Sequence, residues 1–150
     1  MTLSRMSKSV VLIDFGRSID MELLPDGSQF TVSCYTEQFE CVEMQSGRPW
    51  TYQMDYYGLL SCVHMMIHNE YMSVMQDKEG RWVPTKKPHR RVDRAFFGML
   101  YDTFLNVPDC DNLPNLGRII DSLDSLVKGM TTRSRAEGLM DHYKFMEKME

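Results

Sequence analysis

The chain has 150 residues, of which 43% are apolar and 25% charged, and its formal net charge is −4. This length and composition suit one globular domain, or one lobe of a larger domain. The acidic balance gives no reason to expect direct binding to nucleic acid or to an anionic membrane, because both need a basic surplus. No apolar run approaches the roughly 20 residues of a membrane span, so we expect a soluble intracellular protein.

The N-terminal third combines one short apolar run with a long irregular segment. Residues 9–15, Ser-Val-Val-Leu-Ile-Asp-Phe, are rich in β-branched and apolar side chains and end at Gly16, which predicts a short buried strand that meets a turn. Residues 17–50 show no sustained helical period, and we expect at most a short strand at residues 30–34. Long ordered loops inside compact domains are usually functional, so this segment is where we expect the site.

A central helix is predicted from Asp55 onward. Its apolar residues recur at helical spacing: Tyr56, Leu59, Leu60, Val63, Met66 and Ile67. The opposite face carries Cys62 and Met65, and a helix that is apolar nearly all round is a buried one. We therefore expect this helix at the centre of the fold.

The remaining chain predicts an exposed connection and three more helices. Residues 69–88 contain Asp77-Lys78-Glu79-Gly80 and two prolines, which indicates a loop. Helical periods follow over residues 92–104 and 113–127, the second of them ending near Gly129. Residues 133–150 are charged and weakly amphipathic, which predicts a separate last helix that frays or docks on a partner.

Three short elements occur in an informative order. Asp14-Phe15-Gly16 follows the apolar run, Glu43 closes the irregular segment, and Asp55-Tyr56-Tyr57-Gly58 opens the central helix. The tripeptide alone is a weak signal, but the ordered set is typical of a protein-kinase activation segment and its anchoring helix.

The carboxylate of Asp14 suits Mg²⁺, a hard ion that takes oxygen ligands and neutralises the phosphates of ATP during phosphoryl transfer. We expect Phe15 to pack inward and Gly16 to permit the turn; both would contribute to the nucleotide site. The alternative for Asp14 is an ordinary strand-ending Asp in a turn. For Glu43 we expect a buried ion pair with an arginine late in the chain, for which Arg118 is the candidate; the alternative is a solvated loop acid.

Several short segments of the sequence resemble the Bub (budding uninhibited by benzimidazoles) family of mitotic checkpoint serine/threonine kinases. They include Leu-Ile-Asp-Phe-Gly-Arg-Ser-Ile-Asp-Met at residues 12–21, Phe-Glu-Cys-Val-Glu-Met at 39–44, Arg-Pro-Trp-Thr-Tyr-Gln at 48–53 and Phe-Leu-Asn-Val-Pro-Asp-Cys at 104–110. The resemblance extends roughly over residues 11–126. It implies a kinetochore-associated kinase that uses ATP and Mg²⁺, with checkpoint and kinetochore proteins as partners and protein substrates. The implied location is the nucleus and the mitotic kinetochore or chromosome, and otherwise the cytoplasm.

The resemblance also implies what these 150 residues lack. They contain no Gly-rich nucleotide loop, no ATP-pairing strand Lys and no His-Arg-Asp-type catalytic loop. We therefore expect one partial kinase domain, with an activation segment at 14–43 and a helical lobe at 44–150, and with the N-terminal lobe and catalytic loop absent. The expected fold is the mainly α C-terminal lobe of an α+β kinase, with a short N-terminal strand or hairpin.

Two functions follow from this partial domain. The first is a checkpoint kinase that is active only when intact, so that this chain alone is inactive and binds no ATP. The second is a catalytically dead, kinase-like module that docks kinetochore partners. In kinases, the residue at Asp55 accepts backbone N–H bonds from the catalytic loop, and Asp55, Gly58 and Glu43 act as structural anchors; the plain alternative for Asp55 is a helix N-cap.

Side chains in the activation segment suggest regulation by charge. Ser33 and Thr36 can be phosphorylated, and Glu37 supplies negative charge near the expected substrate-docking end. One hypothesis is that Glu37 partly replaces an activating phosphate, weakly, because a carboxylate carries less charge and fewer acceptor atoms. The alternative is a solvated loop acid.

Two further groups of side chains leave alternatives open. His64 and His68 have the i, i+4 spacing of zinc-binding helices, but no third ligand is evident, so a structural histidine pair is favoured. The basic cluster at residues 86–94 is either a solvated face or a docking patch for an acidic or phosphorylated substrate.

The stability of the chain by itself is a separate prediction. An unpaired strand before Asp14 would present an open edge, and Asp55 would lie near the core without donors. We expect a poorly soluble or partly molten chain.

Overall fold

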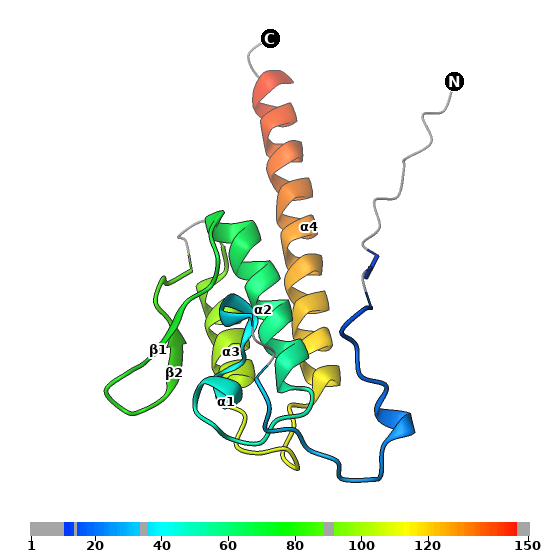
Figure 1. Ribbon diagram of the computed structural model, residues 1–150. Helices are drawn as coiled ribbons and strands as arrows, with labels where there is room; N and C mark the ends of the chain where they lie inside the picture. Colours follow the sequence, from blue (N-terminus) through cyan, green and yellow to red (C-terminus); the bar gives the residue numbers. More distant parts are fainter. Residues whose placement is uncertain (1–10, 14, 34–35, 89–91, 147–150) are drawn as a thin grey trace.

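The computed structural model describes residues 11–13, 15–33, 36–88 and 92–146, with side chains except at Glu37, Thr131 and residues 133–146 (Figure 1). This part of the chain is mainly helical with one two-stranded antiparallel hairpin, which confirms the predicted mainly α class. The elements in chain order are η1 (Met21–Leu23) and η2 (Glu37–Phe39), both 3₁₀ helices, then α1 (Val42–Gln45), α2 (Gln53–His68), β1 (Val74–Gln76), β2 (Trp82–Pro84), α3 (Arg94–Leu105) and α4 (Leu116–Met146).

The core forms where α2 packs against α3 (Figure 1). Leu60 of α2 and Leu105 of α3 are fully buried, each at 0% exposure. Tyr56 stacks on Phe104 with ring centroids 4.9 Å apart and 14° between the ring planes. Such stacked pairs add about 0.5–1.5 kcal/mol beyond their buried area, so this contact fixes the two helices against each other.

The bounds of α2 agree closely with the predicted central helix, which was expected from residue 55. The helix ends at Asn69, whose left-handed φ of 55° is one that Asn tolerates better than other side chains with a Cβ. The Asn69 N–H donates to the Met65 carbonyl at 2.8 Å, which closes the last turn.

The expectation that α2 is buried on all sides is wrong. Its second face is open to solvent within the described residues, with Leu59 at 51% and Met66 at 81% exposure. Cys62 on the same face is also exposed. Packing from α3 and η2 covers only the other side of the helix, so apolar composition here does not equal burial.

The hairpin lies in the segment predicted to be a loop. Val74 faces Pro84 and Gln76 faces Trp82 across the two strands. The turn between them has Gly80 at φ 77°, a conformation that favours glycine. The loop prediction overlooked that the Asp-Lys-Glu-Gly turn signal is flanked on both sides by strand-forming residues.

The predicted N-terminal strand does not form in its described part. Val11, Leu12 and Ile13 have no strand structure and are 74–81% exposed. A strand needs a neighbour for its backbone hydrogen bonds, and the described residues supply none for this segment. Of the strand expected at residues 30–34, the described residues 30–33 form only a single bridge, between Phe30 and Trp50, and residue 34 lies outside the described residues.

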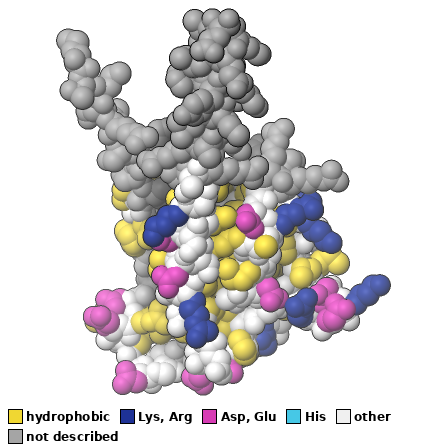
Figure 2. Space-filling view, turned by 180° about the vertical axis from the view of Figure 1, so that it is seen from behind, with side chains coloured by type: hydrophobic (Ala, Val, Ile, Leu, Met, Phe, Trp, Pro, Cys, Tyr) yellow, Lys and Arg dark blue, Asp and Glu magenta, His cyan; other side chains and the backbone are white. Residues whose placement is uncertain are grey.

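Helix α4 is one continuous helix, so the predicted break near Gly129 is wrong. A glycine inside a helix costs only about 1 kcal/mol relative to alanine, and no proline interrupts the segment. Ile119 packs on the core, but most side chains of the described part of α4 are exposed. The face opposite to that of Figure 1 carries hydrophobic side chains between scattered acidic and basic ones (Figure 2). No described helix is both long enough and apolar enough to traverse a lipid bilayer.

Candidate functional site

The predicted metal-binding residue Asp14 lies outside the described residues. Phe15 is 66% exposed, so the expectation that it packs inward is wrong; no described element covers it. Gly16 lies in a turn, as expected, and the Ser18 N–H donates to the Phe15 carbonyl at 3.0 Å. Among the described residues, no three His, Cys, Asp or Glu side chains gather as a metal site.

The phosphorylatable residues of the activation segment have local partners. The Ser33 hydroxyl donates a hydrogen bond to the Glu40 carboxylate. The Arg17 guanidinium donates to the Thr36 hydroxyl oxygen at 3.1 Å, which ties the start of the segment to its end. Glu37 begins η2, and its side chain lies outside the described part.

Glu43 is the buried acid at the end of the activation segment. It lies in the first turn of α1 and is 2% exposed, so the solvated alternative is wrong. Its ion-pair partner is Arg48, with 3.3 Å between Nη2 and Oε1. The predicted partner Arg118 lies exposed in α4 instead. Arg48 is only five residues away and closes the turn after α1, since its N–H donates to the Glu43 carbonyl at 2.8 Å.

The electrostatics of this pair are set by burial. Desolvation raises the pKa of Glu43, and the nearby Arg48 guanidinium offsets part of that effect. Burial also raises the pKa of the neighbouring Cys41 thiol to about 12. Cys41 is therefore a protonated, packed side chain, and the Arg48 guanidinium is the ion-pair partner that favours the charged form of Glu43.

The start of α2 is organised by Gln53 rather than by Asp55. Gln53 is 1% exposed, and its Oε1 accepts the Thr51 N–H at 2.7 Å. Tyr52 occupies the N-cap position, so the N-cap alternative for Asp55 is wrong. Asp55 is exposed in the first turn, although partial desolvation raises its pKa. Gly58 leaves open space where a Cβ would lie.

The expected cost of an unsatisfied Asp55 in the core therefore does not arise in this structure. The carboxylate has no hydrogen-bond or ion-pair partner within the described ranges, but it lies at the surface. An exposed carboxylate is solvated, so it carries little of the penalty of a buried polar group.

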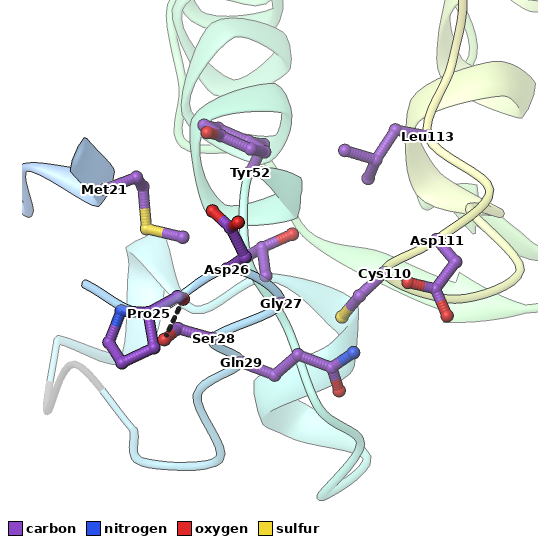
Figure 3. A pocket seen from close by; sticks show the side chains of 11 residues that line it. Met21, Pro25, Asp26, Gly27, Ser28, Gln29, Tyr52, Cys110, Asp111 and Leu113 are labelled. Atoms are coloured by element: carbon purple, nitrogen blue, oxygen red, sulfur yellow. Dashed lines mark hydrogen bonds between the residues drawn. The ribbon is translucent and has the colours of Figure 1, made fainter.

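A pocket of about 220 Å³ lies between the activation segment and the start of α2 (Figure 3). Asp26 points toward the ring of Tyr52 in this view, while Cys110 and Leu113 approach from the opposite wall. The Ser28 hydroxyl donates to the Pro25 carbonyl at 2.6 Å, which holds the turn that forms one rim. No sequence pattern predicts this pocket, because its walls come from three separate segments.

Individual relatives and a solved structure, rather than a family model, show which family this chain resembles. No family model matches the chain. The mitotic checkpoint serine/threonine-protein kinase BUB1 of Mus musculus is 36% identical in an alignment of 149 residues that covers 93% of this chain. The spindle assembly checkpoint serine/threonine-protein kinase BUB1 of Saccharomyces cerevisiae is 37% identical over 118 residues, or 77% of this chain. The crystal structure of the BubR1 kinase domain matches 79% of this chain with a TM-score of 0.74 and 39% identity.

The chain belongs to the Bub family of checkpoint kinases. These comparisons confirm the family resemblance of the sequence. The chain corresponds to the helical C-terminal part of the kinase fold. The Bub-family chain spans 14% of the mouse relative, 12% of the yeast relative and 36% of the BubR1 chain in the crystal. The similarity therefore concerns one part of much longer proteins.

Two histidines of this Bub-family chain, His64 and His68, belong to the last two turns of α2. His64 is 1% exposed, and its Nδ1 lies 3.2 Å from the Tyr101 hydroxyl. The rings of His64 and His68 are 4.4 Å apart, and the Nε2 atom of His68 is buried without a hydrogen-bond partner in the described part. Burial is the main cause that lowers the pKa of His64, which favours its neutral ring in this packed position.

The basic cluster is only partly described. Lys86 pairs with Glu70 at 2.8 Å, and Lys87 and Arg94 are exposed. Residues 89–91 lie outside the described ranges. Whether this surface docks a substrate stays a prediction.

Proposed function

We propose that this chain forms the helical C-terminal lobe of a Bub-type serine/threonine kinase domain, and that alone it transfers no phosphoryl group. The observation that carries the proposal is the buried Glu43 at the end of the activation segment, held by Arg48 beside the α2 core. A buried acid paired in this position fixes the end of the segment, which would support its expected role as a structural anchor.

ATP and Mg²⁺ are proposed as cofactors of an intact domain only. Asp14 would contribute one carboxylate to the ion, next to Phe15 and Gly16 at the nucleotide. Mg²⁺ demands near-octahedral coordination, and the described residues supply no cluster of acidic or other ligating side chains to complete it. The described residues therefore do not form a Mg²⁺ site by themselves, and we assign no catalytic step to them.

The proposal is tested by calorimetric titration of ATP and Mg²⁺ into the isolated chain, and into the chain fused behind the N-terminal part of the BubR1 kinase domain. We expect no binding by the chain alone and binding with kinase activity in the fusion. Asp14→Asn should abolish the activity of the fusion, while Asp20→Asn, an exposed acid of the same segment, should leave it intact. Nucleotide binding by the isolated chain would contradict the proposal.

The charge of Glu37 is proposed to support activity in such a fusion. It begins η2, one residue after the Thr36 side chain that Arg17 contacts. Glu37→Gln should lower the activity severalfold because it removes a charge near the docking end. Glu22→Gln is the matched control in η1, and equal activity of the two variants would dispose of the idea.

A second candidate is a catalytically dead module that binds checkpoint proteins. The exposed apolar side chains Leu59 and Met66 on α2 favour it, because such surfaces often mark interaction sites. A folded but inactive fusion, together with capture of kinetochore proteins by the chain alone, would decide for the module. Charged substitutions at these two positions should then abolish capture.

We also propose that the intact protein acts with checkpoint and kinetochore proteins, phosphorylates protein substrates and locates to the nucleus and mitotic kinetochores. The support is the family to which the chain belongs: the mouse relative is named a mitotic checkpoint kinase and the yeast relative a spindle assembly checkpoint kinase. Imaging of the fluorescently tagged protein in dividing cells tests this. A tag that stays diffuse when spindle attachment is blocked would contradict it.

A further inference from the structure

The two residues at the ends of β1 turn their backbone groups away from β2. At the end of the hairpin, the Asp77 N–H donates to the Arg81 carbonyl at 2.8 Å. Hydrogen-bonded positions in an antiparallel pair recur every second residue, so Met75 also turns its N–H and C=O toward β2. Val74 and Gln76 lie between these positions, and their N–H and C=O groups face outward.

The outer edge of β2 is closed. The Trp82 N–H donates to Oδ1 of Asn106 at 2.7 Å, and Nδ2 of Asn106 donates back to the Trp82 carbonyl at 3.0 Å. The side-chain amide thus takes the place of a neighbouring strand. Pro84 completes the protection because it has no N–H to offer.

The outer edge of β1 is open by contrast. Within the described ranges, the outward N–H and C=O groups of Val74 and Gln76 have no hydrogen-bond partner. Helix α3 packs against β2, and the hairpin lies at one margin of the molecule, so β1 is the outer strand (Figure 1). Two donors and two acceptors in a row form a template for an extended chain rather than for a helix.

A groove of about 410 Å³ is lined by the hairpin, by the segment after α1 and by the segment after α3. Gln76 and Trp82 line it from the hairpin, and Arg48 lines it from the segment after α1. Side chains of an extended chain alternate between faces, so a residue paired beside Gln76 would direct its side chain to the groove side of the hairpin.

Arg48 can recognise an acid in this groove. Its side chain is 40% exposed although it pairs with Glu43. Of the five N–H groups of an arginine, three are used, by Ser46, Pro108 and Glu43. The other two have no partner among the described residues, and a carboxylate is the ligand that best matches them.

We propose that the outer edge of β1 binds an extended peptide segment that places an acidic side chain against Arg48. The backbone edge supplies the binding hydrogen bonds, and the groove selects the side chain. This docking site uses no residue of the expected nucleotide site, so it does not depend on the proposed phosphoryl transfer. The segment belongs to a partner or a substrate, and its chemistry is an extended stretch with one carboxylate.

The probe is a blocked hexapeptide, acetyl-Ser-Val-Thr-Glu-Val-Ser-amide, added in excess to the purified chain. Hydrogen exchange measured by mass spectrometry should slow at the amides of Val74 and Gln76 and remain unchanged in α3. The same peptide with Gln in place of Glu should bind roughly fivefold more weakly, because the charge-assisted contact to Arg48 is lost. Exchange at β1 that the peptide does not alter would overturn the proposal.

Gln76→Pro removes one outward N–H without removing a bond to β2, so the hairpin should persist. We expect about a tenfold loss of peptide binding, whereas Gln76→Ala, which keeps the N–H, should bind as the unchanged chain does. Circular dichroism and exchange in α3 check that both variants are folded. Unchanged binding by a folded Gln76→Pro variant contradicts the proposal. So does protection of β1 that depends on protein concentration alone, because that would indicate pairing with a second copy.

Discussion

Helices α3 and α4 have the same kind of sequence pattern but different surroundings. Helix α3 buries its apolar side chains in the core: Leu100, Tyr101, Phe104 and Leu105. Helix α4 leaves a regular apolar stripe at 45–64% exposure: Leu116, Ile120, Leu123, Val127 and Met130. Periodicity therefore predicts that a segment is helical, but the neighbouring elements decide whether its apolar face is buried.

The two helices should differ most in the loss of stability when a large apolar side chain is replaced by alanine. Leu105→Ala in α3 removes a fully buried side chain and should lower the free energy of unfolding by about 2–5 kcal/mol. Leu123→Ala in α4 should change it by less than about 0.5 kcal/mol, because the side chain is 45% exposed. Urea unfolding followed by circular dichroism measures both. Equal losses would mean that α4 is covered in solution.

Two arginines sharpen the same comparison. Arg48→Met leaves the buried carboxylate of Glu43 without its partner and should cost about 1–3 kcal/mol of stability. Arg118→Met, at the partner expected from sequence, should be nearly neutral because Arg118 is exposed on α4. The unfolding midpoints of the two variants check this. A larger loss of stability for Arg118→Met than for Arg48→Met would support the Glu43–Arg118 ion pair expected from the sequence.

Helix caps give a smaller contrast. The Asp93 carboxylate accepts the Phe96 N–H at 2.9 Å at the start of α3. Asp93→Ala should therefore cost about 1 kcal/mol. Asp121→Ala, within exposed α4, is the matched substitution and should have little effect on the unfolding midpoint. Loss of helical signal only in the Asp121 variant would show that α4 is the more tightly held helix.

The smallest expected effect is a dependence on pH through His64 at the α2–α3 interface. Burial lowers the pKa of His64 below its ordinary 6.5, with His68 and Lys86 adding to the effect and Glu70 opposing it. The unfolded chain then binds the proton more readily, so stability is full above pH 6.5 and falls as pH drops through 6.5 toward the folded pKa.

The difference between the unchanged chain and His64→Gln isolates this contribution. The raised pKa of Glu43 has the opposite effect, because it lowers the stability of the fold as the pH rises from about 4.5. Both proteins contain Glu43, so its contribution cancels when their stabilities are subtracted. Urea midpoints between pH 8 and pH 5 should fall less steeply for His64→Gln. Parallel curves would rule out a role for this histidine.

The helices of the core were predictable because local signals agreed with tertiary packing. The apolar spacing of α2 and α3 gave their bounds to within about two residues. The burial of Glu43 also followed from its place in the ordered motif set. The ion-pair partner of Glu43 was not predictable, because the residue types do not show that the chain turns after α1 and brings Arg48 back to Glu43.

The failures of prediction have one physical origin. The apolar run at residues 11–13 and the second face of α2 were expected to be buried on composition alone. Burial needs a covering element, and the described residues provide none at either place. The hairpin was overlooked because its strands are only three residues each, too short for a periodic signal.

The Asn106 amide has a consequence for how the molecule opens. An isolated two-stranded hairpin is at best marginally stable in water. Asn106 follows directly after α3, and the two hydrogen bonds between its side-chain amide and the Trp82 backbone attach β2 to the end of that helix. Hairpin and α3 should therefore open together as one cooperative unit, with matched exchange free energies, while α4 frays independently of them.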